Sequence, residues 1–236
     1  MNLKKKNDIF SYIFLSFVAA ILIIVLVYFD ASKTNVINFY DKLFVAGFVI
    51  IGCIFGISLA FFPRWYKKSL KSSKKSQYKK HKIVASRDRK GHHPDCNEFK
   101  NHVIRINKKV FCSGCIGLAI GAFSSIILVI IYLAVNSKIT LIISFFLIYI
   151  GLILITFNLI EIIIPYRHKI IHIFSNIFIM IGFLMIVIGV FEITGSKTYA
   201  VISIIFTFLW LNTRIQLSNF RHSMICDKCK EKCKMY

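Results

Sequence analysis

The sequence predicts an all-α integral membrane protein with about six transmembrane helices. Of its 236 residues, 57% are hydrophobic, and the mean hydropathy is +0.69, which is far from the profile of a soluble domain. Six apolar runs follow one another along the chain, and five are long enough to cross a hydrocarbon core about 30 Å thick. Lysines and arginines gather in alternate connections between these runs, which is typical of multi-pass membrane proteins.

Each apolar run is interpreted as one span. The first run follows "MNLKKKND" and is longer than the apolar core of a signal peptide, which has about 7–15 residues, so we expect a retained helix. The last run is short enough to be a re-entrant segment, but the polar residues on both sides favour a span. The six expected spans are residues 9–29, 43–62, 116–135, 140–164, 170–191 and 199–211.

The basic residues predict the orientation of these spans. An even number of spans places both termini on one side, and the segments on that side carry 27 of the 31 lysines and arginines. Because cytoplasmic segments are enriched in basic residues, we expect a multi-pass protein of the cell membrane with both termini in the cytoplasm.

The spans and charges together divide the chain into four parts. The basic loop carries much of the net charge of +21, and such clusters are attracted to anionic lipid headgroups by about 1 kcal/mol per residue. Nucleic-acid binding is not expected, because no recognised binding fold accompanies the charge, and no protein partner is identified. The parts are a transmembrane hairpin (1–62), a basic cytosolic loop (63–111), a four-helix bundle (112–213) and a Cys-rich cytosolic tail (214–236).

Cysteine and histidine are sorted to the same side as the basic residues. Six of the seven cysteines and all seven histidines lie in segments that the charges assign to the cytoplasm. That compartment is reducing, so clustered cysteines favour metal binding or catalysis over disulfides. The remaining cysteine, Cys53, lies within the second apolar run and is expected to pack there.

The loop ends in a pattern typical of a metal site, which predicts a small cytosolic Cys/His metal-binding loop. A Cys-x2-Cys pair follows an upstream Cys and His, as in tetrahedral zinc sites. Between them "HVIRINKKVF", residues 102–111, alternates apolar and polar residues and predicts a short strand or hairpin. The expected ligands are Cys96, His102, Cys112 and Cys115, with His92 and His93 as alternates.

The tail carries a second cluster, whose potential ligands are His222, Cys226, Cys229 and Cys233. On a continuous helix these positions form one stripe, but they extend over about 16 Å at a rise of 1.5 Å per residue. That length is too great for one ion. Either the tail bends, or it contributes two or three ligands to a site shared with the loop.

The identity of the metal and its use stay open at this level. Zinc is favoured by the many histidines, whereas a [4Fe–4S] cluster would require four thiolates. We expect a structural zinc site in a membrane binding or scaffold protein. The alternatives are a membrane redox protein, which would use an iron–sulfur cluster or the Cys112 and Cys115 thiols, and a metal transporter or metal sensor.

Several residues within the spans are also informative. Glu161 lies near one end of the fourth span, and Asn158 is on the same helical face, so both are functional candidates. His168 and His172 follow, four residues apart, and are candidates to bind a metal or to pair with Glu161. Gly117 and Gly121 form a Gly-x3-Gly step after the cysteine pair, which predicts close approach of another helix.

Residues 92–121, "HHPDCNEF…H…FCSGCIGLAIG", resemble an uncharacterised family of small prokaryotic integral membrane proteins. In that family a His and Cys pair precedes an aromatic residue, and a later Cys-x2-Cys-x-Gly motif enters a helix. Here "HPDC" places His before Cys, whereas the opposite order is expected in many members. The resemblance implies a multi-span layout and no known activity.

Overall fold

Six helices and one two-stranded hairpin make up the part of the chain that the computed structural model describes, residues 3–30, 37–61, 102–106, 109–135, 139–164 and 168–228. All six helices are long and apolar enough to cross a membrane, which confirms the expected all-helical, multi-pass fold. In chain order the elements are α1 (Leu3–Asp30), α2 (Phe39–Phe61), β1 (Val103–Ile106), β2 (Lys109–Cys112), α4 (Ser113–Val135), α5 (Leu141–Ile163), α6 (Lys169–Thr194) and α7 (Lys197–Lys228).

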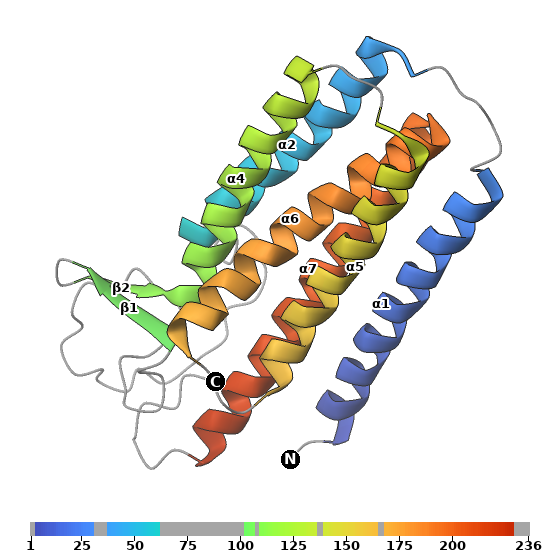
Figure 1. Ribbon diagram of the computed structural model, residues 1–236. Helices are drawn as coiled ribbons and strands as arrows, with labels where there is room; N and C mark the ends of the chain where they lie inside the picture. The colour runs from blue at the N-terminus through green and yellow to red at the C-terminus, as the bar shows by residue number, and fades with distance from the viewer. Residues whose placement is uncertain are drawn as a thin grey trace, which may run out of the picture.

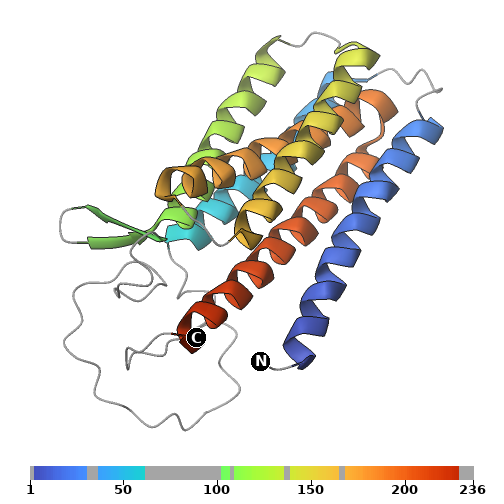
Figure 2. The same cartoon turned by 60° about the horizontal axis from the view of Figure 1, so that its bottom comes forward.

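The helices form one bundle around α6 (Figure 1), which packs against α4, α5, α7 and α1. Helix α2 packs mainly on α4, and α1 packs mainly on α7. The β hairpin, the N-terminal end of α1 and the C-terminal end of α7 lie at the same end of the bundle, as Figures 1 and 2 both show. We call this the hairpin end.

Glycines let α4 approach α6 closely. A Cβ atom on Gly117 would stand 2.5 Å from the Ile173 carbonyl oxygen, and one on Gly121 would stand 2.9 Å from the Ile177 Cα. Both distances are too short for a side chain, so α4 and α6 meet backbone to backbone, as expected for small residues at membrane helix interfaces. The prediction from the Gly-x3-Gly step is therefore confirmed.

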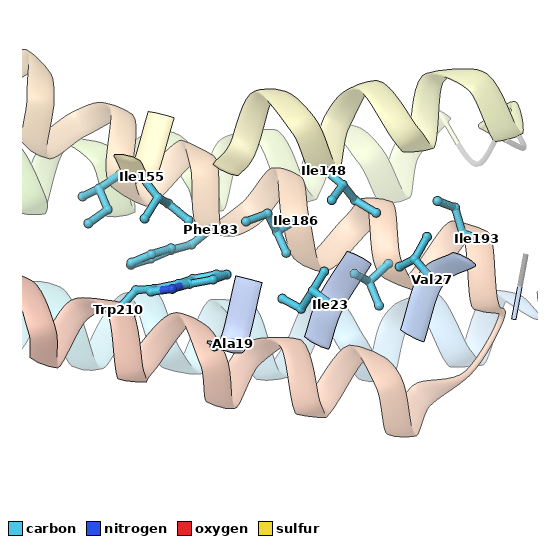
Figure 3. Close-up of a cluster of buried hydrophobic side chains, with 11 residues drawn as sticks. Ala19, Ile23, Val27, Ile148, Ile155, Phe183, Ile186, Ile193 and Trp210 are labelled. Carbon is cyan, nitrogen blue, oxygen red and sulfur yellow. The ribbon is translucent and has the colours of Figure 1, made fainter. Parts of the chain in front are cut away.

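The centre of the bundle is an apolar cluster that joins α1 to α5, α6 and α7 (Figure 3). Phe183 of α6 stacks on Trp210 of α7, with ring centroids 6.3 Å apart. The Trp210 Nε1–H donates to the Ser16 carbonyl oxygen of α1 at 2.9 Å, so its polar group is satisfied within the apolar interior. These contacts fix α1, many of whose apolar side chains face outward, as lipid-facing residues do.

Five helices extend beyond the expected spans at one end or both, and α7 extends the furthest. The residues expected to begin the tail continue α7 to Lys228, and Arg214 and His222 are buried against the bundle rather than hydrated. The apolar run at 199–211 underestimates this helix, because polar residues on a bundle-facing stripe lower the hydropathy without ending the helix. Helix α4 begins at Ser113, so Cys115 lies within its first turn.

A buried ion pair lies at the end opposite the hairpin. Lys42 Nζ of α2 is 3.3 Å from Glu192 Oε1 of α6, and the Tyr132 hydroxyl of α4 donates a short hydrogen bond to the same carboxylate. Lys42 also lies over the Tyr132 ring at 5.0 Å from its centroid. Three helices are thereby joined through one carboxylate.

Candidate functional site

The hairpin brings His102 beside the cysteine pair. Strand β1 pairs antiparallel with β2, with Val103 opposite Cys112, which confirms the hairpin predicted from the alternating pattern. The Ser113 hydroxyl, at the start of α4, donates to the His102 carbonyl oxygen at 3.0 Å. His102 and Cys112 are both buried where the hairpin meets the bundle.

Cys112 and Cys115 form a pair of thiols at the N-terminal end of α4. They are not joined by a disulfide, and a side-chain hydrogen bond links the two sulfurs. Cys112 is buried, and Cys115 is partly exposed. Cys112 is the last residue of β2, and Cys115 lies in the first turn of α4.

Three imidazoles gather around this pair from three elements of the chain. The His102 ring lies edge-on to the His222 ring of α7, with centroids 5.5 Å apart. It also lies edge-on to the His172 ring of α6, with centroids 6.1 Å apart. All three rings are buried, so His102 stands between two imidazoles in a largely dehydrated environment.

Glu161 of α5 holds His172. Its carboxylate oxygens lie 3.0 Å and 3.2 Å from His172 Nδ1, and both side chains are buried. Next to this pair, the Asn176 amide donates to the His172 carbonyl oxygen, and Asn158 Nδ2 donates to Ser175 Oγ at 2.8 Å. The structure therefore shows Glu161 paired with His172, which is one of the alternatives that the sequence left open. The Asn158 amide nitrogen, in turn, is bonded to a side chain of α6.

Arg214 brings a buried positive charge from α7 to the same place. A methyl group on Gly114, the residue before Cys115, would lie 2.9 Å from His172 Nε2 and 3.0 Å from Arg214 Nη2. The guanidinium is close enough to Cys112, Cys115 and Glu161 to interact with each electrostatically. The turn between the two cysteines is therefore covered by an imidazole and a guanidinium.

Some polar atoms of this cluster are unsatisfied. Arg214 Nε, Asn158 Oδ1 and Asn176 Oδ1 are buried and have no hydrogen-bond partner within the described ranges. Buried polar atoms usually have a hydrogen-bond partner, because leaving a polar group unpaired costs about 1–3 kcal/mol.

Four of the ten expected metal ligands have described side chains, and the structure brings all four to the hairpin end. They are His102, Cys112, Cys115 and His222. Cys226 lies in α7 with its side chain outside the described part. His92, His93, Cys96, Cys229 and Cys233 lie outside the described residues.

The described side chains do not form a complete metal site. Within the described ranges, no group of three or more His, Cys, Asp or Glu side chains is arranged to hold a metal ion. The donors lie instead as a thiol pair and a set of three imidazole rings. The metal-binding loop therefore stays a prediction.

Sequence reasoning missed Arg214 and Asn176 as members of the cluster. One signal was present for Arg214: Arg214, Ser218 and His222 follow one another at intervals of four residues, which places them on one face of a helix. That face is the one α7 turns toward the cluster, because Arg214 and His222 are buried.

Comparison with protein-family models, with curated proteins and with solved structures finds no match to this chain.

Proposed function

We propose that the hairpin end binds a zinc ion through the Cys112 and Cys115 thiolates and the His102 imidazole, with a fourth ligand from the surrounding side chains. One observation carries the proposal: an adjacent pair of thiols lies at the same end of the bundle as three imidazoles, although they come from separate parts of the chain. Thiolate and imidazole are the ligands that zinc prefers.

The described donors support this assignment in kind, since they include two thiols and three imidazoles at the same end of the bundle. Arg214 interacts electrostatically with both cysteines. Because the thiols and the imidazoles are separate groups in the described structure, binding requires their side chains to turn toward one ion.

The role that we propose for the ion is structural. Zinc in a closed set of four protein ligands stabilises folding and leaves no position for substrate. Here it would join the hairpin to α4. In this proposal the hairpin end faces the cytosol, the basic loop contacts anionic lipid headgroups, and the protein is a membrane scaffold that presents the hairpin to a partner.

Elemental analysis tests the proposal directly. The full chain, purified in detergent, is expected to contain about one zinc per chain. Cys112→Ser and His102→Ala are each expected to remove it. Cys53→Ser is the matched control, because Cys53 is buried within α2, away from the cluster. Wild-type protein without bound metal, or variants that retain it, would contradict the proposal.

A redox function is the second candidate, supported by the adjacent thiols of Cys112, at the end of β2, and Cys115, in the first turn of α4. Cys-x2-Cys pairs at a helix N-terminus can cycle between dithiol and disulfide. Titration with glutathione redox buffers would distinguish the two. A zinc-bound pair resists oxidation, whereas a redox pair forms the Cys112–Cys115 disulfide at a defined potential without loss of metal.

A further inference from the structure

Three nitrogen atoms from two helices meet beside Gly114, the second residue of α4. A Cβ atom on Gly114 would lie 2.9 Å from His172 Nε2, 3.0 Å from Arg214 Nη2 and 3.6 Å from Asn176 Nδ2. All three side chains are buried. Arginine is rarely buried unless it is paired, and an ionisable side chain within a membrane span is a candidate for a functional role.

Arg214 lacks an acceptor for part of its guanidinium. Its exposed fraction is 7%, and its Nε has no hydrogen-bond partner within the described ranges. Its acidic neighbour Glu161 holds both carboxylate oxygens close to His172 Nδ1, at 3.0 Å and 3.2 Å. Its other two neighbours, Cys112 and Cys115, carry sulfur, which is a weak acceptor. A buried guanidinium in this position favours an oxyanion, which it binds with two parallel N–H donors.

The N-terminal end of α4 supplies an independent attraction for an anion. This helix has 23 residues and no acidic residue in its first turn. The first N–H groups of a helix have no partner within the helix and form the positive end of its dipole, so phosphate groups commonly bind there. Gly114 lies in this turn, and Arg214 Nη2 therefore approaches the same end of the helix.

We propose that the first turn of α4 binds a phosphate group together with Arg214, Asn176 and His172. The inference goes beyond the proposed function, because neither Arg214 nor Asn176 is a ligand that zinc prefers. In this site the guanidinium and the helix N–H groups provide the positive charge.

The side chains of the site offer acceptors as well as donors, which favours phosphate over other oxyanions. Asn176 Oδ1 is buried without a hydrogen-bond partner in the part of the chain that the structure describes. In the neutral His172 ring, Nδ1 carries the proton that faces Glu161, because a carboxylate only accepts, and Nε2 is then an acceptor. Phosphate at neutral pH carries both O–H and O⁻ groups, whereas sulfate carries no O–H. Phosphate therefore matches the guanidinium and both acceptors.

The place of the turn allows two sources for the phosphate group. The membrane span of α4 begins at Ser113, so the turn lies where the lipid headgroups are expected. Cys115, one residue after Gly114, is partly exposed, which puts the turn near the surface of the hairpin end. The ligand is therefore either free phosphate or the phosphate monoester of a lipid headgroup.

Binding of radiolabelled phosphate to the full chain in detergent tests the inference. We expect saturable binding of about one phosphate per chain. Arg214→Gln should weaken it about 10- to 100-fold, the effect of losing a charged hydrogen-bond partner. Gly114→Ala should weaken it by about 10-fold, because the new methyl group pushes Arg214 Nη2 and His172 Nε2 away from the turn.

The matched control is Arg221→Gln, which removes the same charge from the same helix. Arg221 Nη1 donates to the Ile163 carbonyl oxygen instead, so phosphate binding should be unchanged. Arg214→Lys is a milder variant that keeps the charge but loses the parallel donors, and it should also bind more weakly. Each variant is measured on the monodisperse fraction, so that loss of the fold is not mistaken for loss of the site. Wild-type protein that binds no phosphate, or equal losses from Arg214→Gln and Arg221→Gln, would overturn the inference.

Competition identifies the ligand and its source. Unlabelled phosphate should displace the label at about 10-fold lower concentration than sulfate, because only phosphate supplies an O–H to the two acceptors. Equal displacement would overturn the assignment to phosphate. Displacement by phosphatidic acid in mixed micelles, with phosphatidylcholine as the reference lipid, would identify a headgroup as the source, whereas displacement by inorganic phosphate alone would identify the free ion. Because elemental analysis tests zinc separately, failure of phosphate binding would leave the zinc proposal standing.

Discussion

Lys42 and Glu192 form an ion pair across the bundle with both side chains almost fully buried: Nζ lies 3.3 Å from Oε1, at 4% and 2% side-chain exposure. In an apolar interior an unpaired charge is very costly, so each side chain depends on the other. Tyr132 supports the pair from a third helix through its hydroxyl and its ring. The pair therefore specifies how α2 packs against α6 and α4.

Breaking this pair should destabilise the protein strongly. Lys42→Met leaves the Glu192 carboxylate buried without its cation, and the expected cost is about 3–5 kcal/mol. Unfolding by sodium dodecyl sulfate in mixed micelles measures the effect. Lys197→Met is the control, since the Lys197–Asp41 pair spans 2.9 Å with Lys197 half exposed, and such a pair contributes about 0–1 kcal/mol. Equal losses from the two variants would contradict the buried pair.

Close packing of α4 on α6 predicts a second difference between matched variants. Gly117→Ala places a methyl group 2.5 Å from the Ile173 carbonyl oxygen and should destabilise the protein by about 1–3 kcal/mol through overpacking. Gly47→Ala in α2 meets nothing within 4 Å and should be neutral or stabilising by up to about 1 kcal/mol. The same unfolding assay compares them, and a neutral Gly117→Ala would show that the helices do not meet at this glycine.

Attachment of α1 should depend on one hydrogen bond of Trp210. Trp210→Phe keeps an aromatic ring against Phe183 but removes the donor to the Ser16 carbonyl oxygen, with an expected cost of about 1–3 kcal/mol. Helix α1 should then detach from the bundle more often, so a protease should cleave within α1 faster. Ser203→Ala is the control in the same helix, because the Ser203 hydroxyl bonds only a carbonyl of its own helix among the described contacts. Similar proteolysis rates for both variants would argue against this anchor.

Metal removal should expose the thiols of the site selectively. If zinc holds Cys112 and Cys115, a membrane-permeant chelator should raise the alkylation rate of the partly exposed Cys115 at least 10-fold, because the metal-bound thiolate is protected. Cys53, buried within α2, should not respond. Mass spectrometry of alkylated peptides gives both rates from one sample. Cys115 that reacts equally fast with and without chelator would show that no metal protects it.

The predicted architecture was largely readable from local patterns. Apolar runs of about 20 residues specify spans because a bilayer leaves backbone groups no other way to be satisfied. The alternation in residues 102–111 specified the hairpin, and Gly117 with Gly121 specified a close helix contact. These three features depend on residues that are near one another in the chain, so they could be predicted from the sequence alone.

The candidate site could be predicted from the sequence only in part. His102, Cys112 and Cys115 lie close together because the hairpin is local. Arg214 and His222 were assigned to a cytosolic tail, since hydropathy averages over a helix and cannot show that its polar stripe faces the bundle. The burial of Glu192 likewise could not be predicted from its own helix, because it depends on an ion pair with Lys42 of another helix.

By itself, the sequence determined the number of helices, the hairpin and the kinds of donor atoms available, because these follow from hydropathy, periodicity and residue type along a short stretch of chain. Only the tertiary structure decided which side chains meet. Helix packing turns α5, α6 and α7 about their axes and carries Glu161, His172 and Arg214 to the turn between two cysteines. That rotation is set by steric contacts between residues far apart in the chain, so no local pattern encodes it.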